Sequence, residues 1–451
     1  MSHDLSGFKA YDLRGRVPDQ LNEELARDIG RAYAAFIRPR TVVIGHDIRT
    51  SGPALATALA EGLMVGGADV SDIGLCGTEE IYFATAHLGV DGGIMVTASH
   101  NPADYNGMKF VREQARPISA DTGLMDIRDL IAAGNLPVAA QKGRRSSVDV
   151  SDAYIEHLIS YVDLTSLASL KIVVNAGNGG AGAVIDRLEP HLPFEFVKVH
   201  HEPDGSFPNG VPNPLLPENR FATIDAIKKS GAQLGIAWDG DFDRCFLFDE
   251  TGAFIEGYYV VGLLAEAMLK LHSGGKIVHD PRLIWNTQEI VKQNGGTTVQ
   301  CKSGHAFIKE RMRREDAVYG GEMSAHHYFR DFSFCDSGMI PWLLVAGIMS
   351  ESGKPLSALV NQRIEKFPVS GEINRQLHDP VAALEKIRAK YAPDALFVDE
   401  TDGLSFEFAD WRFNLRLSNT EPVIRLNVEA RRDPALLDER TREILEIIDA
   451  E

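Results

Sequence analysis

The sequence predicts an α/β protein: three similar α/β domains with mixed sheets and a smaller C-terminal α+β domain, arranged around a central cleft. Three observations support this fold class. A strand–helix–strand pattern occurs three times along the 451 residues. Each copy ends in a strand that leads into a polar loop of distinctive composition. The last part of the chain then changes to alternating apolar and polar residues, which is typical of antiparallel strands.

Each of the three copies has a first strand rich in β-branched residues, a helix-length stretch, a second strand, and a third strand with a polar loop. Strands that alternate with helices pair largely in parallel, and such sheets bind ligands at the ends of the strands. The first strands are expected within 41–49, 170–180 and 275–282, the second within 68–75, 194–201 and 297–304, and the loops at 97–102, 238–244 and 320–327.

The segment that starts near residue 364 has the period of half-buried antiparallel strands and closes with an amphipathic helix. The strands are expected within 367–377, 402–408, 411–418 and 423–432, and the helix within 433–449. The repeat spacing and a linker-like stretch at 139–152 predict four domains, at 1–146, 147–249, 250–363 and 364–451.

The composition excludes several classes of protein. A formal net charge of −18 argues against nucleic acids and anionic membranes as partners, although a local cationic pocket can still bind a small anion. The four cysteines form no CxxC pair, which indicates buried reduced thiols rather than a zinc site or a disulfide framework. There is no apolar signal core at the start and no stretch that could span a membrane, so we expect a cytoplasmic protein.

The loop WDGDFDR places carboxylates on alternate residues, Asp239, Asp241 and Asp243. Carboxylates this close repel one another unless a cation lies among them, and oxygen ligands favour Mg²⁺ or Ca²⁺. A calcium loop between two helices would need glycine where Arg244 stands, and the flanks here are strand-like. A solvated acidic turn is the simpler alternative, but the apolar residues on both sides of the loop disfavour it.

Ser99 ends an apolar strand, in the sequence TASHNP. A serine in a turn is most often a cap or a turn former. Beside a carboxylate-bound metal, however, serine can act as a phosphoryl carrier. A phosphoserine carries roughly −1.5 to −2 charges and can supply the metal with a further oxygen ligand. Lys109 follows in YNGMKF and adds a cation to the same region.

Two further loops offer groups for a sugar and for a phosphate. In GGEMSAHH, Glu322 and Ser324 can form hydrogen bonds with vicinal hydroxyls, and His326 adds a donor. In RLSNTEP, Arg416 can bind phosphate through two hydrogen bonds, and the backbone amides of the turn can form an anion nest. Taken alone, either loop could be an ordinary polar turn.

Together, these four loops resemble those of the α-D-phosphohexomutase superfamily, and the resemblance covers the whole chain in order. TASHNPADYNGMK is similar to the family's phosphoserine loop, DGDFDR to its metal loop, GGEMSAH to its sugar loop and RLSNTEP to its phosphate loop. The residues GEMS resemble the phosphomannomutase/phosphoglucomutase branch. In HDPR, Arg282 departs from the lysine of many relatives, so a planar fork replaces a compact ammonium.

The resemblance implies a role for each matching position. Ser99 becomes the phosphorylated residue and, with Asp239, Asp241 and Asp243, a ligand of one Mg²⁺ ion per chain. The candidate catalytic residues are Ser99, Lys109, Arg14 and His100. The candidate substrate-binding residues are Tyr11, Arg244, Arg282, His305, Glu322, Ser324, His326, Arg416, Ser418, Asn419 and Thr420.

The resemblance also implies the reaction, a reversible shift of phosphate between positions 1 and 6 of mannose, and of glucose as well. A hexose 1,6-bisphosphate is the expected intermediate and activator, and it must turn over so that its other phosphate returns to Ser99. The expected partners are small sugar phosphates, with no nucleic acid and no membrane, and the chain is expected to be a monomer or a weak homo-oligomer. The implied pathway is the synthesis of GDP-mannose and polysaccharides.

Lys109 is the candidate general base for the accepting hydroxyl. Free lysine has a pKa near 10.4, and we expect Arg14, Arg244 and Mg²⁺ to lower the pKa of Lys109. The alternative is that Lys109 stays charged and steadies the phosphate. We expect His100 to have an orienting role, because adjacent side chains of an extended chain point to opposite sides.

Three other functions are considered. A metal-dependent sugar-phosphate phosphatase would use the same serine and aspartates, but hydrolysis needs no phosphate loop in a fourth domain. A non-catalytic sensor would keep the binding loops and lose the nucleophile or the metal ligands, all of which are present here. A phosphoglucosamine mutase is the nearest competitor within the family.

Overall fold

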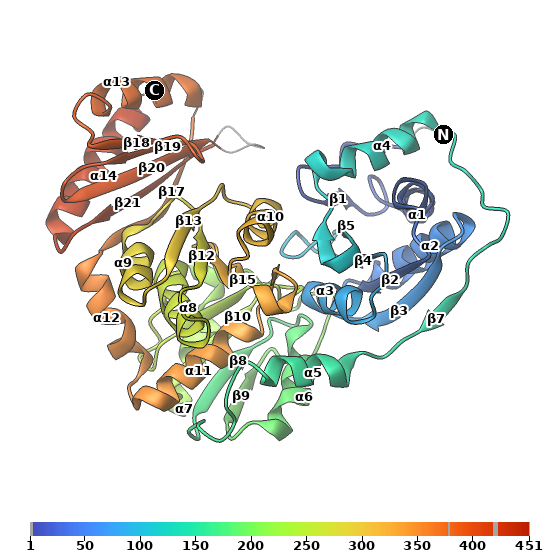
Figure 1. Ribbon diagram of the computed structural model, residues 1–451, viewed down its shortest axis with the longest axis horizontal. Helices are drawn as coiled ribbons and strands as arrows, with labels where there is room; N and C mark the ends of the chain where they lie inside the picture. The colour runs from blue at the N-terminus through green and yellow to red at the C-terminus, as the bar shows by residue number, and fades with distance from the viewer. Residues whose placement is uncertain (1–2, 378, 418–422, 451) are drawn as a thin grey trace. The chain divides into compact units, whose positions relative to one another are not determined.

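The computed structural model describes residues 3–377, 379–417 and 423–450, and the chain folds into two compact units (Figure 1). Unit 1 comprises residues 1–254 and 326–353, and unit 2 comprises residues 255–325 and 354–451. Both units contain sheets covered by helices, so the predicted α/β class with mixed sheets is confirmed. No helix in the described ranges has both the length and the apolar character needed to cross a membrane.

The first sheet of unit 1 has seven strands, in the order β1-β5-β4-β2-β3-β7 with β6 beside β5. β2 pairs in parallel with β3 and β4, whereas β5 is antiparallel to β4 and to β1. The strands are β1 (Leu13–Arg16), β2 (Thr41–His46), β3 (Asp69–Leu75), β4 (Gly92–Val96), β5 (Tyr105–Arg112), β6 (Arg116–Pro117) and β7 (Arg145–Ser147).

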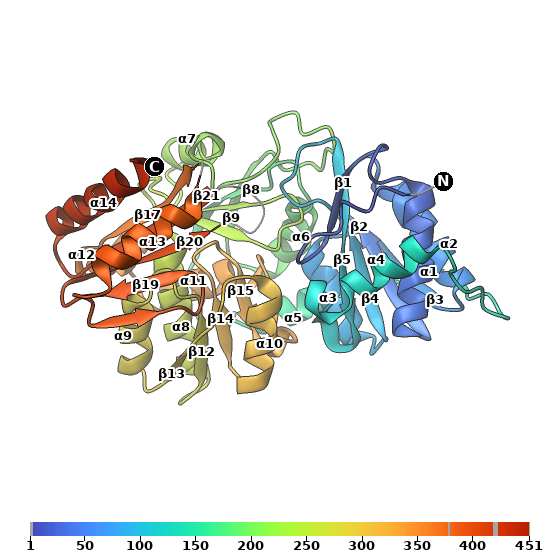
Figure 2. The ribbon, with the colours of Figure 1, turned by 90° about the horizontal axis from the view of Figure 1, so that it is seen from above.

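Helices cover both faces of this sheet. Ile44 and Ile94 belong to one core together with side chains of the helices α1, α2 and α4. Val43 and Met95 alternate with them and therefore point to the opposite face, where α3 lies (Figure 2). The helices are α1 (Glu23–Ile37), α2 (Gly52–Val65), α3 (Thr78–His87) and α4 (Leu124–Ala133).

The second sheet of unit 1 has the order β11-β10-β8-β9, with β8 parallel to β9 and β10 and with β11 antiparallel to β10. This repeats the order β5-β4-β2-β3 of the first sheet, so the predicted repeat of one α/β pattern is confirmed for these two copies. The elements are α5 (Ser151–Ile159), β8 (Lys171–Asn175), α6 (Ala181–Leu188), β9 (Glu195–Val199), α7 (Phe221–Ser230), β10 (Leu234–Trp238) and β11 (Cys245–Phe248).

Unit 1 also contains the short antiparallel pair β15 (His327–Phe329) and β16 (Cys335–Asp336), followed by α11 (Ile340–Ser352). The buried Trp342 of α11 packs against Phe196 of β9 and against Phe194 directly before this strand, which fixes the helix to the second sheet.

Unit 2 begins with a third copy of the pattern, in which β12 is parallel to β13 and to β14. Its elements are α8 (Gly257–Leu271), β12 (Lys276–His279), α9 (Trp285–Gln293), β13 (Thr297–Gln300), α10 (His305–Glu315), β14 (Tyr319–Gly321) and α12 (Leu356–Lys366).

The rest of unit 2 is an antiparallel sheet with the order β17-β21-β20-β19-β18, as the alternating sequence predicts. Its core contains Phe413 and Leu426 of the sheet and Ile444 of the predicted closing helix. The elements are β17 (Val369–Gln376), α13 (Pro380–Tyr391), β18 (Phe397–Asp399), β19 (Leu404–Glu407), β20 (Trp411–Leu417), β21 (Val423–Ala430) and α14 (Pro434–Asp449).

Candidate active site

The serine turn follows directly after β4 and is strained. Ser99 has a φ of +48°, in the left-handed region that non-glycine residues rarely adopt. Its hydroxyl lies 2.9 Å from Asp239 Oδ2 and 3.0 Å from Nδ1 of His100. The expectation that the side chains of Ser99 and His100 point to opposite sides is therefore wrong, because the chain is not extended at Ser99. The two side chains instead converge.

A buried arginine that the sequence reasoning missed holds this turn. The guanidinium of Arg49, 1% exposed, donates hydrogen bonds to four backbone carbonyl oxygens of the turn and its exit. Asp47 accepts a hydrogen bond from the hydroxyl of Thr97 at 2.6 Å, and this hydroxyl in turn accepts one from the backbone N–H of Ser99. These contacts supply the stabilisation that the left-handed conformation of Ser99 requires.

The acidic loop lies between β10 and β11, which pair with each other as antiparallel strands. Its flanks are therefore strands, and a calcium loop between two helices is excluded. Asp239, Asp241 and Asp243 are all buried, and they can offer oxygen atoms within 4.8 Å of one another. Within the described residues, Asp241 Oδ1 and Asp243 Oδ1 are buried without a hydrogen-bond partner. An all-oxygen set with orphaned buried acceptors fits a hard divalent cation such as Mg²⁺.

Two cations partly neutralise these carboxylates. Lys109 Nζ lies 2.7 Å from Asp241 and 2.6 Å from Asp243, and Arg244 donates to Asp239 at 2.7 Å. Burial opposes the ionisation of Asp241, but Lys109 together with hydrogen bonds from Thr78 and Ser99 outweighs burial and lowers the pKa of Asp241. Burial raises the pKa of Asp243, and the adjacent Asp241 carboxylate raises it further. The carboxylates of Asp241 and Asp243 are thus unequal, although both lie beside the same ammonium group of Lys109.

The electrostatic setting of Lys109 differs from the expected one. Burial and Arg14 lower the pKa of Lys109, but the carboxylates of Asp241 and Asp243 outweigh both and raise it above its ordinary value. Arg14 thus lowers this pKa in the expected direction, but the expectation left out Asp241 and Asp243, whose carboxylates reverse the net shift. The ammonium form is favoured because two carboxylate oxygens accept its hydrogen bonds.

His100 and Arg14 lie next to the serine. Arg244 lies 2.7 Å from the Nδ1 atom of His100, and burial together with Arg244 lowers the pKa of His100, which keeps the imidazole neutral. Arg14 of β1 donates to Asp12, to the carbonyl of Ala98 and to Asn101, so it braces the same turn. The half-buried Tyr11 precedes β1.

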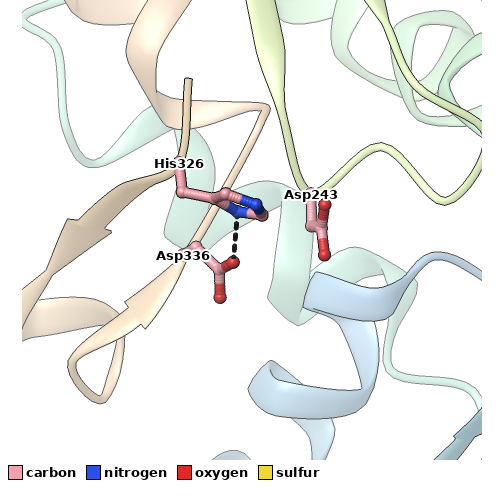
Figure 3. A group of neighbouring side chains, drawn as sticks. All are labelled: Asp243, His326 and Asp336. Atoms are coloured by element: carbon pink, nitrogen blue, oxygen red, sulfur yellow. Dashed lines mark hydrogen bonds and ion pairs between the residues drawn. The ribbon is translucent and has the colours of Figure 1, made fainter. Parts of the chain in front are cut away.

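A second acidic group lies beside the aspartate loop, as Figure 3 shows. His326 Nδ1 lies 2.9 Å from the buried Asp336 of β16, and its imidazole lies between Asp336 and Asp243. Burial opposes the protonation of His326, but the bond to Asp336 and the nearby Asp243 raise its pKa above the ordinary value. His326, which the sequence analysis assigned to the loop expected to bind the sugar, thus lies beside the aspartates of the loop expected to bind the metal.

Unit 2 brings four other predicted residues into one neighbourhood. Arg282, 4% exposed, binds both carboxylate oxygens of Asp280 and lies 3.4 Å from the hydroxyl of Ser324 and 3.8 Å from Glu322. Glu322 accepts a hydrogen bond from the backbone N–H of residue 304, directly before the predicted His305. The planar fork of Arg282 is thus used on Asp280, which lysine could not bind in the same two-point manner.

Glu372 links this neighbourhood to the antiparallel sheet. It lies 3.4 Å from Arg282 and 3.6 Å from Arg416, and Arg416 also approaches Asp402 at 3.4 Å. The register of β17 against β21 shifts just before Glu372. The predicted phosphate-binding residues Ser418, Asn419 and Thr420 lie outside the described residues.

Three functional candidates escaped the sequence reasoning. Thr78 donates to Asp241 at 2.5 Å, Arg49 clamps the serine turn, and Glu372 joins two arginines. Signals existed for two of them. The motif Asp-x-Arg after the first strand occurs at Arg49 as it does at Arg282, and Gly371 inside a strand pattern indicates a bulge beside Glu372. Nothing in the local sequence singles out Thr78.

Comparison with known proteins places the chain in a family. The four domains described as phosphoglucomutase/phosphomannomutase alpha/beta/alpha domains I, II and III and C-terminal domain match residues 6–136, 152–252, 256–367 and 372–447. Phosphohexose mutases of Xanthomonas campestris pv. campestris are 63% identical, covering 98% of this chain and 99% of theirs. A phosphomannomutase of Escherichia coli K12 is 59% identical over the same shares of both chains.

A solved structure agrees with this assignment. A phosphoglucomutase/phosphomannomutase family protein from Burkholderia thailandensis is 34% identical with a TM-score of 0.88, covering 98% of this chain and 97% of its own. Both the sequence and the fold therefore lead to the same conclusion: the chain belongs to the phosphoglucomutase/phosphomannomutase family and is a phosphohexomutase.

Proposed function

We propose that the chain interconverts mannose 1-phosphate and mannose 6-phosphate, and the corresponding glucose phosphates, with Ser99 as the temporary phosphoryl carrier. The observation that carries this proposal is the place of the Ser99 hydroxyl, 2.9 Å from Asp239 in a loop of three buried aspartates. A hexose 1,6-bisphosphate is the proposed intermediate, because Ser99 gives its phosphoryl group to one end of the sugar and is phosphorylated again by the phosphate at the other end.

Asp239, Asp241, Asp243 and an oxygen of phosphorylated Ser99 would hold one Mg²⁺ ion. The orphaned oxygens of Asp241 and Asp243 support this assignment. When bound there, the ion stabilises the charge that develops on the phosphoryl oxygens. Arg244 holds Asp239 in place, since it donates to both Asp239 and His100.

The contacts of Lys109 favour the second of its two expected roles. Its ammonium already has two carboxylate partners, and we propose that it stays charged and steadies the phosphoryl oxygens rather than acting first as a base. In unit 2, we propose that Glu322 and Ser324 bind sugar hydroxyls. Arg416, with Ser418, Asn419 and Thr420, would bind the phosphate that is not transferred.

Ser99→Ala tests the carrier directly. We expect turnover to fall by at least about 10³-fold, because the covalent step is lost, whereas the affinity for sugar phosphate stays similar. Wild-type protein mixed with ³²P-labelled glucose 1,6-bisphosphate should retain label on residue 99, as peptide mass spectrometry can locate. Active protein that never carries this label would contradict the proposal.

Assays with different substrates distinguish the proposed mutase from a phosphatase and from a phosphoglucosamine mutase. A coupled assay offers mannose, glucose and glucosamine 1-phosphates in turn, and a parallel assay follows inorganic phosphate. We expect turnover of the first two sugars and no stoichiometric phosphate release. Release matching substrate loss would indicate a phosphatase, and a preference for glucosamine 1-phosphate would indicate the competing mutase.

Two variants of Lys109 separate its roles. Lys109→Met removes the charge and should lose most turnover while still binding substrate. Lys109→Arg keeps a permanent positive charge but cannot exchange a proton near neutral pH. We expect Lys109→Arg to retain at least tenfold more turnover than Lys109→Met. Equal loss in both variants would favour proton transfer by Lys109.

A further inference from the structure

A fully buried glutamate outside the predicted site joins two segments of unit 1, and burial raises the pKa of its carboxyl group to about 8 despite hydrogen bonds from Tyr154 and Ser337. Glu79, in the first turn of α3, is 0% exposed. Its Oε1 accepts hydrogen bonds from the hydroxyl of Tyr154 at 2.5 Å and from the hydroxyl of Ser337 at 2.8 Å. Its Oε2 accepts from the backbone N–H groups of Gly338 at 2.5 Å and Met339 at 3.3 Å, directly before α11. Glu79 thus binds the start of α11 from another part of the chain.

The residue before Glu79 contacts the aspartate loop. Thr78 donates through its hydroxyl to Asp241 Oδ2 at 2.5 Å and through its backbone N–H to the carbonyl oxygen of Asp241 at 3.1 Å. A single peptide unit therefore separates the buried carboxylate from a residue that fixes both the side chain and the backbone of a proposed metal ligand.

The segment on the other side of Glu79 contacts the same loop. The carbonyl oxygen of Gly338 accepts a hydrogen bond from Trp238 Nε1 at 2.8 Å. A Cβ atom at Gly338 would lie only 2.3 Å from the carbonyl oxygen of Phe242, so glycine permits the close approach here. A Cβ atom at Gly77 would lie 2.2 Å from the Phe242 ring. The loop 239–244 is therefore in contact with residues 77–78 and with residue 338.

We propose that Glu79 is a positioning residue for the metal loop: it ties together the two segments that contact the loop and so holds Asp241 in the geometry that binds a divalent cation. The inference rests on the proposed metal site. Without the Glu79 side chain, two hydroxyls, those of Tyr154 and Ser337, and the two backbone N–H groups before α11 lose their acceptor. The segments 77–79 and 337–339 are then free to relax. Partners behind a metal ligand typically change metal affinity by about 10- to 100-fold.

The test measures Mn²⁺ binding to the full chain by electron paramagnetic resonance, which counts free Mn²⁺ and needs no turnover. We expect Glu79→Ala to raise the dissociation constant of Mn²⁺ about tenfold. Glu79→Gln keeps one carbonyl oxygen for the backbone N–H groups and should recover most of this loss. When activity is titrated with Mg²⁺, the concentration needed for half-maximal activity should rise in the same order, from wild type to Glu79→Gln to Glu79→Ala. The KM for sugar phosphate should change less than this Mg²⁺ concentration.

Unit 2 offers a matched control. Glu429 is also 0% exposed, accepts a hydrogen bond from the Tyr258 hydroxyl, and binds the backbone N–H groups of Ile284 and Trp285 at the start of α9. Glu429→Ala should lower thermal stability at least as much as Glu79→Ala, because it also leaves the buried Arg412 without its carboxylate partner, but it should leave the Mn²⁺ dissociation constant within twofold of wild type. A Glu79→Ala protein that binds Mn²⁺ as tightly as Glu429→Ala would overturn the inference.

A milder variant covers the case in which Glu79→Ala does not fold. Tyr154→Phe removes only one donor to Glu79 and should weaken Mn²⁺ binding about threefold, whereas an unchanged value contradicts the proposal. Asp241→Asn tests the metal site itself. If wild type binds Mn²⁺ and Asp241→Asn does not, the site stands, and an unaltered Glu79→Ala protein then disproves only the positioning role.

Discussion

The two units contain the same turn and use it differently. β2 of unit 1 and β12 of unit 2 both end at the histidine of a His-Asp-x-Arg turn, at 46–49 and 279–282. In both turns the backbone N–H of the arginine donates to the aspartate Oδ1 atom at 2.9 Å. The histidine Nδ1 atom lies within 2.9 Å of the backbone carbonyl oxygen of the aspartate that follows it. The local backbone chemistry is thus the same in both copies.

The arginine side chains have different partners. Arg49 donates to four backbone carbonyl oxygens, and it is not among the residues expected to bind substrate. Both arginines also lie beside the aspartate of their own turn, but Arg282 faces further carboxylates and a hydroxyl, namely Glu322, Glu372 and Ser324. One copy of the turn therefore builds the loop that bears the serine, and the other presents a cation beside the side chains that we propose bind the sugar. The comparison shows that a repeated motif predicts a place in the fold but not a role.

Arg49→Lys should have the largest effect. An ammonium has three donors on a flexible stem and cannot satisfy four carbonyls, so the serine turn loses support and Asp47 loses part of its charge partner. We expect the free energy of unfolding to fall by at least about 3 kcal/mol, with most turnover lost. Urea unfolding and steady-state kinetics measure both. A stable variant would mean that Arg49 is dispensable for the turn.

The contributions of Asp47 and Asp280, the aspartates of the two turns, to folding stability should change with pH in opposite directions. Burial raises the pKa of Asp47 to about 6, despite Arg49. The protonated carboxyl is therefore favoured on folding, and this contribution, up to about 3 kcal/mol, is present below pH 3.8 and lost as the pH rises to about 6. Burial also opposes the ionisation of Asp280, but Arg282 outweighs it and lowers the pKa, so stability from Asp280 is present above pH 3.8 and is lost as the pH falls.

Thermal melting of Asp47→Asn and Asp280→Asn across pH 3 to 7 checks these signs. Relative to wild type, Asp47→Asn should gain stability as the pH rises, whereas Asp280→Asn should lose it. The same slope in both variants would show that the two turns are electrostatically equivalent.

Arg282→Lys should have the smallest effect. The charge beside Asp280 and Glu372 survives, and only the two-point contact with Asp280 is lost. We expect a stability loss of about 1 kcal/mol and an increase in KM of about threefold, with kcat within twofold of wild type. If Arg282→Lys destabilised the protein as much as Arg49→Lys, the distinction between the two arginines would fail.

Much of the fold could be predicted because its signals are local. β-branched runs and alternating polarity located the strands β2, β8, β12 and β20, and the repeated polar loops located the chemistry. The conformation of Ser99 could not be predicted, because it depends on Arg49, which lies 50 residues away in sequence. The raised pKa of Lys109 has a similar cause, since its carboxylate partners come from the loop between β10 and β11 of another sheet. The roles of the individual site residues remain predictions.

The left-handed backbone at Ser99 has a consequence for protein engineering. Glycine adopts this conformation without cost, so Ser99→Gly would relieve the strain at the same time as it removes the hydroxyl. A library screened for heat resistance alone would therefore enrich inactive proteins at this position, and any directed evolution of the enzyme should select on sugar-phosphate turnover as well.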